Sequence, residues 1–448
     1  MATLSHCNGG VTRRSAVLCL AVLCASSPAA SRGPDLLAGD DTIQLTLEAP
    51  LGRLFERGQT DENFTVPGTL TYTDARTGEP ITLRDVVVSA RGHSSRRETE
   101  CTFPKLKLKI AAGVGLKIGT HCGETDDGTL SAKYGRLSNE RSPHREALAY
   151  RLLEAAGVPT LRTRPARIAY VDGGKAPLVR NALLVEDDDD AGRRLGGTKE
   201  IPLEAFGSVQ SRRAAAEGAR IAFGEAMIGN FDWCLKYTPD DIYRCDDSKP
   251  LWNVLAFDRT NGSVALVAKD FDLAGAVAGS HKWFGKVFNR GLVPSKSERE
   301  TEVVAQVQRT RTLFPRATLD AERRHFLDRK SAVYGALDKA DVDADGRAIA
   351  RDYLDAFYAA IADDQYYRTV VGKAGVRVYA DAARGAEACG RGDLLREGTP
   401  VDVRRHSGDM SEVILLDALW RWADKDPCPA VLNGPVWIRS DAITRNYP

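Results

Sequence analysis

The sequence predicts an α+β protein with a strand-rich first part, a mainly helical second part and a small all-β domain at the end. Apolar and polar residues alternate with period two within residues 42–110, which indicates strands. Helical periodicity appears in segments between residues 143 and 369, and short strands separated by turns return after residue 374. A chain of 448 residues is too long for one core, so we expect about two or three domains.

The composition excludes some classes of partner. Lys plus Arg number 62 and Asp plus Glu number 61, so no net charge attracts nucleic acid or an anionic membrane. Hydrophobic residues make up 43%, which is ordinary for a soluble globular protein. We therefore expect no nucleic-acid partner.

Residues 1–30 have the pattern of a cleaved signal peptide. Arg13 and Arg14 precede an apolar run over residues 16–25, and small residues follow it. The run is too short to span a bilayer as a stable helix, so no transmembrane segment is expected after cleavage. The sequence thus predicts a periplasmic or secreted protein.

The cysteines also indicate export. Nine cysteines become six once Cys7, Cys19 and Cys24 are removed, and an even number in an exported chain is typical of disulfides. Several pairings are possible, and we expect the nearest-neighbour set. That set pairs Cys101 with Cys122, Cys234 with Cys245, and Cys389 with Cys428.

The strand-rich part ends in a strand that carries lysines on one face. Strands are expected over residues 42–47, 68–73, 81–90 and 103–110. A polar turn, Arg91–Arg96, precedes the last strand, in which Lys105, Lys107 and Lys109 alternate with apolar residues. Lysines on an edge strand prevent aggregation, so this face can simply be solvated. Alternatively, one lysine faces a nucleotide whose phosphates meet the turn.

The second part alternates helices with short strands. A helix is predicted from Pro143, which suits its first turn, to Gly157, which with Pro159 ends it. Further elements are expected as strands over residues 167–170 and 182–186, a helix over residues 212–231, and helices within residues 298–369.

Polar residues follow three apolar segments in the middle of the chain. Asp232 ends the second predicted helix, Asn253 opens a short apolar strand, and Asp270 and Asp272 close the next strand. Phosphoryl transfer needs a carboxylate for the acceptor hydroxyl and oxygen ligands for magnesium. Asp and Asn are also common at strand ends because they hydrogen-bond their own backbone, so both interpretations stay open.

The order of these motifs resembles the spore-coat CotH kinase family over roughly residues 42–369. The motifs are Arg91-Gly92-x-Ser94-Ser95-Arg96 with Phe103-Pro104-Lys105, the helix from Arg145 to Leu152, Asn230-x-Asp232-Trp233, and Asp270-Phe271-Asp272. The resemblance implies a two-lobed atypical protein-kinase-like fold that uses ATP and magnesium. The N-terminal lobe would cover residues 40–180, and the mainly helical C-terminal lobe residues 181–370.

The resemblance also implies a set of site residues. Asp232 would be the catalytic or substrate-orienting carboxylate. Asn253 and Asp270 would bind magnesium, with Asp272 supporting the metal or the turn. The nucleotide would be bound by the turn residues Arg91, Ser94, Ser95 and Arg96, by Lys107 with Lys105 as the alternative, by its partner Glu146, and by a hinge strand ending at Glu186.

The sequence departs from ordinary protein kinases in three respects. The phosphate-covering turn is rich in Ser and Arg rather than Gly, and the His-Arg-Asp and Asp-Phe-Gly motifs are absent. The interval between Asp232 and Asn253 is also long, whereas the corresponding interval in ordinary kinases is short. The long interval bears on the assignment of Asn253.

Residues 374–448 predict a small SH3-like barrel. Short apolar strands are separated by turns, and the segment from Gly434 to Ile443 resembles the last strand of bacterial SH3-type domains. A disulfide between Cys389 and Cys428 would brace a domain of this size. Besides the nucleotide, the candidate partners are a protein substrate and a cell-wall component bound by this barrel.

Three functions remain open at this point. The first is an exported CotH-like atypical kinase that transfers a phosphoryl group to a hydroxyl, most plausibly on protein. The second is a catalytically inactive kinase-like scaffold that acts as an interaction module of the cell envelope. The third is a phosphotransferase for a non-protein envelope substrate. Scarce nucleotide outside the cytosol favours the scaffold, whereas two mutually repelling carboxylates, Asp232 and Asp270, favour an enzyme.

Overall fold

The computed structural model describes most of the chain after the predicted signal peptide. The described residues are 35–74, 77–92, 96, 103–110, 114–120, 141–202, 205, 215–235, 250–279, 299–300, 303–304, 306–307, 310, 313–362, 370–373, 375–385, 395, 401–415 and 435–444. The signal peptide, Ser94, Ser95 and the cysteines other than Cys234 lie outside them. In the described part, no helix is both long and apolar enough to cross a membrane.

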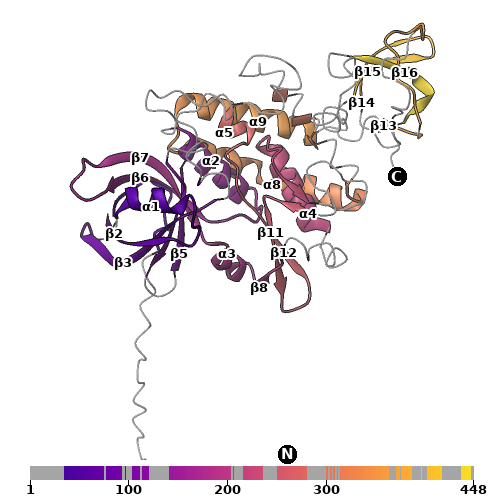
Figure 1. The fold of residues 1–448 in the computed structure, drawn as a ribbon. Helices are drawn as coiled ribbons and strands as arrows, with labels where there is room; N and C mark the ends of the chain where they lie inside the picture. Colours follow the sequence, from indigo (N-terminus) through magenta and orange to yellow (C-terminus); the bar gives the residue numbers. More distant parts are fainter. Residues whose placement is uncertain are drawn as a thin grey trace, which may run out of the picture. The chain divides into compact units, whose positions relative to one another are not determined.

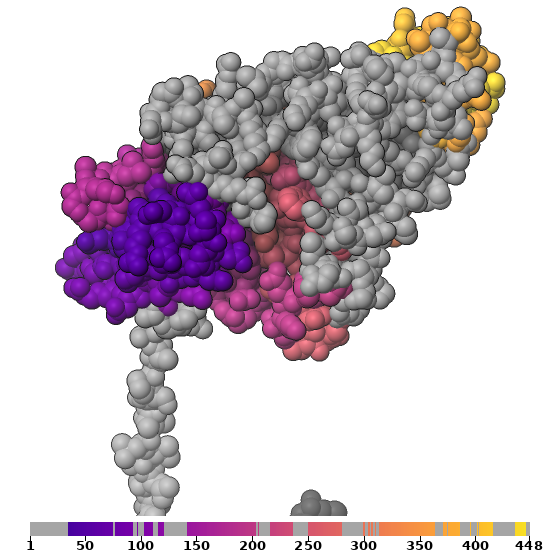
Figure 2. Space-filling view, viewed as in Figure 1, coloured from indigo at the N-terminus to yellow at the C-terminus, as the bar shows by residue number. Residues whose placement is uncertain are grey.

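The first part of the chain forms a closed barrel (Figure 1). Its strands, in barrel order, are β1 (Ile43–Glu48), β2 (Thr65–Thr73), β3 (Pro80–Ala90), β4 (Leu106–Ile110), β5 (Val114–Gly119), β7 (Leu178–Glu186) and β6 (Thr163–Val171). Parallel pairing of β1 with β6 closes the barrel. In Figure 2 the indigo and purple residues form one continuous body.

The alternation in the sequence explains how the barrel is filled. In β4, Leu106 and Leu108 are fully buried, while Lys107 between them lies on the other face of the strand. The predicted strands of this part are confirmed. The sequence did not predict β5 or the helix α1 (Leu51–Gly58), and it did not predict that the sheet closes.

A second core contains the helices and a three-stranded sheet. The helices are α2 (Ser142–Ala155), α3 (Asp188–Arg194), α4 (Ala215–Met227), α5 (Gly275–Ala278), α8 (Arg316–Lys339) and α9 (Ala344–Ala362). The sheet has the order β12 (Val264–Ala268), β11 (Val254–Arg259), β8 (Gly197–Glu200). Within this core, the rings of Phe223, Phe326 and Phe357 from three helices pack together, with centroids 5.4–6.3 Å apart. The predicted helices over 143–157 and 212–231 are confirmed, with shorter bounds.

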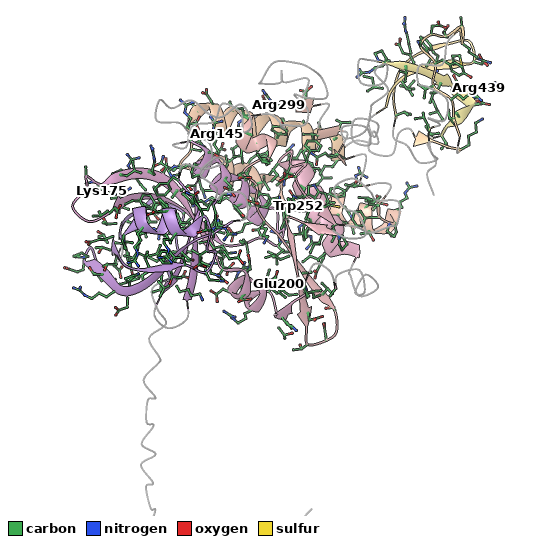
Figure 3. The ribbon with its side chains drawn as sticks, in the orientation of Figure 1. Arg145, Lys175, Glu200, Trp252, Arg299 and Arg439 are labelled. Atoms are coloured by element: carbon green, nitrogen blue, oxygen red, sulfur yellow. The ribbon has the colours of Figure 1, made fainter. Side chains whose placement is uncertain are left out.

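A buried arginine fixes helix α2 to the start of α9. Arg145 is 4% exposed, and its guanidinium donates two hydrogen bonds to the carboxylate of Asp343, at 2.6 and 2.8 Å (Figure 3). This bidentate geometry is the strongest form of such a pair. The pair thus fixes the position of the helix that also carries Glu146.

Two glycines bring the segment before Asp232 against the segment after Asp272. Gly229 has a φ of +63°, and a Cβ there would lie 2.2 Å from the ring of Tyr353. A Cβ on Gly275 would lie 2.1 Å from the Tyr353 hydroxyl oxygen. Glycine at both positions allows the two backbones to approach closely. The N–H of Gly275 donates to the carbonyl of Gly229 at 2.9 Å.

The last part contains a small antiparallel sheet with its own core. The sheet consists of β14 (Val401–Ser407), β15 (Met410–Leu415) and β16 (Val436–Arg439), and β13 (Val370–Val371) pairs with β17 (Ile443–Thr444). Residues 376–379 make two isolated bridges, from Val376 to Leu395 and from Tyr379 to Trp437. The antiparallel sheet is confirmed, and the SH3-like barrel stays a prediction.

Candidate functional site

Asp232 and Asn253 are neighbours in the structure despite their separation in the sequence. The short strands β9 (Cys234–Leu235) and β10 (Leu251–Trp252) pair antiparallel, with Cys234 opposite Trp252. This antiparallel pairing brings Asn253, which follows β10, back to Asp232, which precedes β9. The Nδ2 of Asn253 donates to the carboxylate of Asp232 at 3.1 Å and to its backbone carbonyl at 2.6 Å. The long interval therefore does not separate the two residues.

Asp270 lies beside Asn253 because strands β11 and β12 pair. Val254 is opposite Ala268, and the N–H of Lys269 donates to the carbonyl of Asn253 at 3.0 Å. Asn253 and Asp270 thus stand at the same end of adjacent strands. The structure therefore brings both Asp232 and Asp270 next to Asn253.

The backbone is strained at two of these positions. In the described part of the chain, the non-glycine residues with positive φ are Asp85, Asn253, Asp270 and Arg384. Asn253 has φ of 52° and Asp270 has φ of 65°. Such conformations cost on the order of 1–3 kcal/mol and gather at functional sites. Asn and Asp are the side chains that tolerate them best.

The lysine that reaches this site is Lys105. Its Nζ lies 3.3 Å from the Oδ2 of Asp272 and 3.6 Å from the Oδ1 of Asp270. Burial alone would lower the pKa of Lys105, but the charges of Asp272, Asp270 and Glu146 outweigh it and raise that pKa. Lys105 is therefore charged at neutral pH.

Lys107, which we expected to be the phosphate-pairing residue, has a different partner. Its Nζ lies 2.5 Å from the Oδ2 of Asp187, on the segment that follows β7. Lys105 and Lys107 lie on the same face of the strand, as period two requires, so the strand pattern could not separate them. The structure brings Lys105, and not Lys107, to Asp270 and Asp272.

Helix α2 presents two side chains, one turn apart, to the same loop. The hydroxyl of Tyr150 accepts the N–H of Asp270 at 3.0 Å, and its ring packs on Phe271 with centroids 4.5 Å apart. Glu146 is buried one turn earlier. Burial and the charge of Asp272 raise the pKa of Glu146 to about 8, against the opposing charge of Lys105. The site therefore has an excess of carboxylates over cations.

The predicted phosphate-covering turn is described at its first and last positions. The N–H of Arg91 donates to the carbonyl of Lys105 at 2.8 Å. The positive charge of Arg91 lowers the pKa of both Lys105 and Glu146, although burial and the nearby carboxylates have larger effects. Arg91 is therefore close enough to influence the site. Arg96 instead pairs with Glu62 at 3.0 Å.

Glu186 ends β7, where the resemblance places the hinge. Its carboxylate accepts the backbone N–H of Arg162 at 2.9 Å and the guanidinium of Arg194 at 2.7 and 3.0 Å. The side chain is 6% exposed. The carboxylate thus holds β7 to α3, and it is engaged within the chain rather than presented to a ligand.

A buried acid that sequence reasoning missed supports Asp232. The side chain of Asn230 accepts the N–H of Asp232 at 3.0 Å, and its Nδ2 donates to the Oε2 of Glu225 at 2.8 Å. Glu225 and Asn230 are fully buried. Burial raises the pKa of Glu225 well above its ordinary value, which favours the protonated form of this carboxyl. An acid within a buried helical run, five residues before Asn230, was the available signal.

Replacing Glu225 with glutamine should flatten the pH dependence of stability. Because the pKa of Glu225 is raised in the folded state, its protonated carboxyl contributes fully to the free energy of unfolding below the ordinary pKa of 4.5. That contribution is lost as pH rises toward the folded-state pKa. One proton gives a slope of at most about 1.4 kcal/mol per pH unit. Glutamine keeps the acceptor for Asn230 and cannot titrate. Urea denaturation from about pH 5 to pH 9 measures both slopes, and equal slopes in the two proteins would contradict this account.

The oxygen ligands of the site fit magnesium. Among the described residues, no three His, Cys, Asp or Glu side chains are arranged to hold a metal ion by themselves. Magnesium commonly needs only one or two carboxylates because phosphates and waters complete its shell. The carboxylate of Asp270 is 46% exposed, that of Asp272 is 23% exposed, and Asn253 adds an amide oxygen. A divalent cation would neutralise the charges of Asp272 and Asp270, which add to the effect of burial on the pKa of Glu146.

Comparisons with known proteins do not name a family for this chain. The sequence matches no protein-family model, and it matches no curated protein. The functional conclusion therefore depends on the geometry of these side chains.

Proposed function

We propose that the protein is a magnesium-dependent phosphotransferase with a two-lobed, atypical kinase-like fold similar to that of the CotH family. The proposal depends on one observation: a lysine, an asparagine and three acidic residues from five separate parts of the chain lie close together. Those residues are Lys105, Glu146, Asp232, Asn253 and Asp270.

Each of these residues has a role that follows from its contacts. Asp232 would orient the acceptor hydroxyl and take its proton, because its carboxylate is held by Asn253 and its backbone by Asn230. Asn253 and Asp270 would bind magnesium, with Asp272 beside them. These residues would hold magnesium where its charge offsets that of the phosphates of ATP, the nucleotide that the resemblance implies.

Lys105 would exchange its partners when nucleotide and magnesium bind. Its Nζ lies within 3.6 Å of both Asp270 and Asp272, and magnesium would compete for the same oxygens. Released from these carboxylates, the ammonium group could donate to a phosphate while Glu146 keeps it in position. The acceptor hydroxyl attacks the terminal phosphorus, the bond to the bridging oxygen breaks, and the nucleoside diphosphate leaves.

A catalytically inactive scaffold is the second candidate, and one observation favours it. Cys234, two residues after Asp232, is disulfide-bonded. Disulfides persist in oxidising compartments, which supports export to the periplasm or the medium. Nucleotide is scarce there, so a kinase-like fold could serve as an interaction module of the envelope. We propose that the C-terminal part is an SH3-like barrel that binds a cell-wall component in either case.

The full-length mature protein can decide between these candidates. The thermal unfolding midpoint should rise when magnesium and a nucleoside triphosphate are added together, and rise less with either one alone. Label from the terminal phosphate should then appear on a protein acceptor such as casein or on the protein itself. If no nucleotide shifts the midpoint with magnesium or manganese, the scaffold is the correct function.

A further inference from the structure

Two fully buried polar residues, Glu225 and Asn230, form the end of helix α4 and lead directly into Asp232. Both are 0% exposed, and Gly229 between them turns the chain with a φ of +63°. The N–H of Asn230 donates to the carbonyl of Glu225 at 2.8 Å, and its Nδ2 donates to the Oε2 of Glu225 at 2.8 Å. Glu225 therefore holds Asn230 through both its backbone and its side chain.

Asn230 extends this constraint to Asp232. The Oδ1 of Asn230 accepts the N–H of Asp232 at 3.0 Å. From the other side, the Nδ2 of Asn253 donates to the carbonyl and the carboxylate of Asp232, at 2.6 and 3.1 Å. The proposed base is thus held between two asparagines, and loss of either one would leave it anchored on one side.

The turn between Glu225 and Asn230 is also tied to the segment that follows Asp272. The N–H of Ala276 donates to the carbonyl of Ile228 at 3.0 Å, next to the hydrogen bond between Gly275 and Gly229. The end of α4 is therefore a fixed point from which the position of Asp232 can be set.

The end of α4 does not by itself require an acid at position 225. Gly229 supplies the left-handed turn, and the carbonyl of Glu225 accepts the N–H of Asn230 whatever the side chain. A buried carboxyl is costly unless its polar atoms are paired, and the Oε1 of Glu225 has no hydrogen-bond partner in the part of the chain that the structure describes. An apolar side chain would avoid this cost. The hydrogen bond between Oε2 and Asn230 is the contact that accounts for an acid here.

Glu225 is also close enough to Asp232 for their charges to interact. Burial raises the pKa of Glu225, and the negative charge of Asp232 adds to that rise. An uncharged Glu225 can stand near the carboxylate of Asp232 without repelling it.

We propose that Glu225 and Asn230 are positioning residues of the transfer reaction, which set the place of the Asp232 carboxylate. This inference rests on the proposed phosphotransferase function and adds to it two residues that act only through Asp232. A base must meet its proton in a narrow geometry, so that a displacement of about 1 Å can cost about 10²-fold in rate. Binding of magnesium and nucleotide should not respond, because Lys105 and Asp270 lie on other segments.

Replacing Glu225 with methionine in the full-length mature protein tests this inference. Glu225→Met keeps the length of the side chain and removes the acceptor for Asn230. We expect kcat for transfer of labelled phosphate from ATP to casein to fall about 10- to 10²-fold, with KM and Kd for magnesium and ATP within about twofold of the wild type. Glu225→Gln should restore kcat, because its amide oxygen accepts from Asn230. Asn230→Ser breaks the same link from the other side and should repeat the effect of Glu225→Met.

A double-mutant cycle distinguishes action through Asp232 from a general loss of structure. In the Asp232→Asn background, Glu225→Met should not lower the residual transfer further, because the base that it positions is already gone. Glu217→Met is the matched control, since Glu217 lies on the same helix and pairs with Arg259 at 2.6 Å. Its kcat should equal that of the wild type.

The outcomes separate this inference from the function on which it rests. Wild-type kcat in both Glu225→Met and Asn230→Ser, or an equal fall in the Asp232→Asn background or in Glu217→Met, would overturn the positioning role and leave the phosphotransferase standing. Weaker nucleotide binding in Glu225→Met would indicate a structural defect and would overturn it as well. Absence of both nucleotide binding and transfer in the wild type would overturn both proposals.

Discussion

Replacing Asp270 with asparagine should abolish magnesium-dependent nucleotide binding, whereas replacing Asp232 with asparagine should abolish transfer and leave binding intact. Asp270 is the most exposed carboxylate beside Lys105, so its charge is available to a metal. Asp232 instead accepts a hydrogen bond from Asn253 and would act on the acceptor hydroxyl. Loss of a general base costs about 10²–10⁴-fold in rate.

Asparagine is the informative replacement at both positions. Asp270 has φ of 65°, which asparagine tolerates, whereas alanine would add backbone strain to the loss of charge. At position 232, an asparagine oxygen can still accept from the Nδ2 of Asn253. Titration calorimetry with magnesium measures binding, and transfer of labelled phosphate measures the rate. Wild-type affinity in Asp270→Asn, or wild-type turnover in Asp232→Asn, would refute the roles assigned here.

The strands and helices could be predicted because their signals are local. Period two identified β1 to β4, and helical periodicity with proline and glycine at its ends identified α2. Closure of the barrel carries no such signal. It depends on parallel pairing between Ile43 and Ala166, residues that come together only when the whole barrel folds.

The candidate site was predictable in its residue types and less so in its contacts. Asp232 and Asp270 follow apolar segments, which the sequence shows directly. Asn253 is far from Asp232 along the sequence, and only the pairing of β9 with β10 brings the two residues together in space. The choice between Lys105 and Lys107 depends on where Asp270 and Asp187 lie after folding, and strand periodicity contains no information about that.

The same two lysines give the second large expected effect. Replacing Lys105 with methionine should lower kcat/KM by about 10²–10³-fold, because a preorganised donor to the phosphates is lost. Lys107→Met should have a small effect, since Lys107 is 34% exposed and pairs with Asp187, outside the transfer site. Lys109→Met is the control for the substitution itself, because Lys109 lies on the same strand and is exposed.

A metal titration without nucleotide separates the proposed role of Lys105 from simple misfolding. Removing its charge takes a cation away from Asp270 and Asp272, so the repulsion between these two carboxylates rises. Magnesium alone should then stabilise Lys105→Met more than it stabilises the wild type, although nucleotide turnover is lost. A general folding defect would instead reduce stability with and without magnesium. If Lys107→Met loses turnover and Lys105→Met keeps it, the phosphate-pairing lysine is Lys107, and the contacts of Lys105 serve only to hold the loop of Asp270.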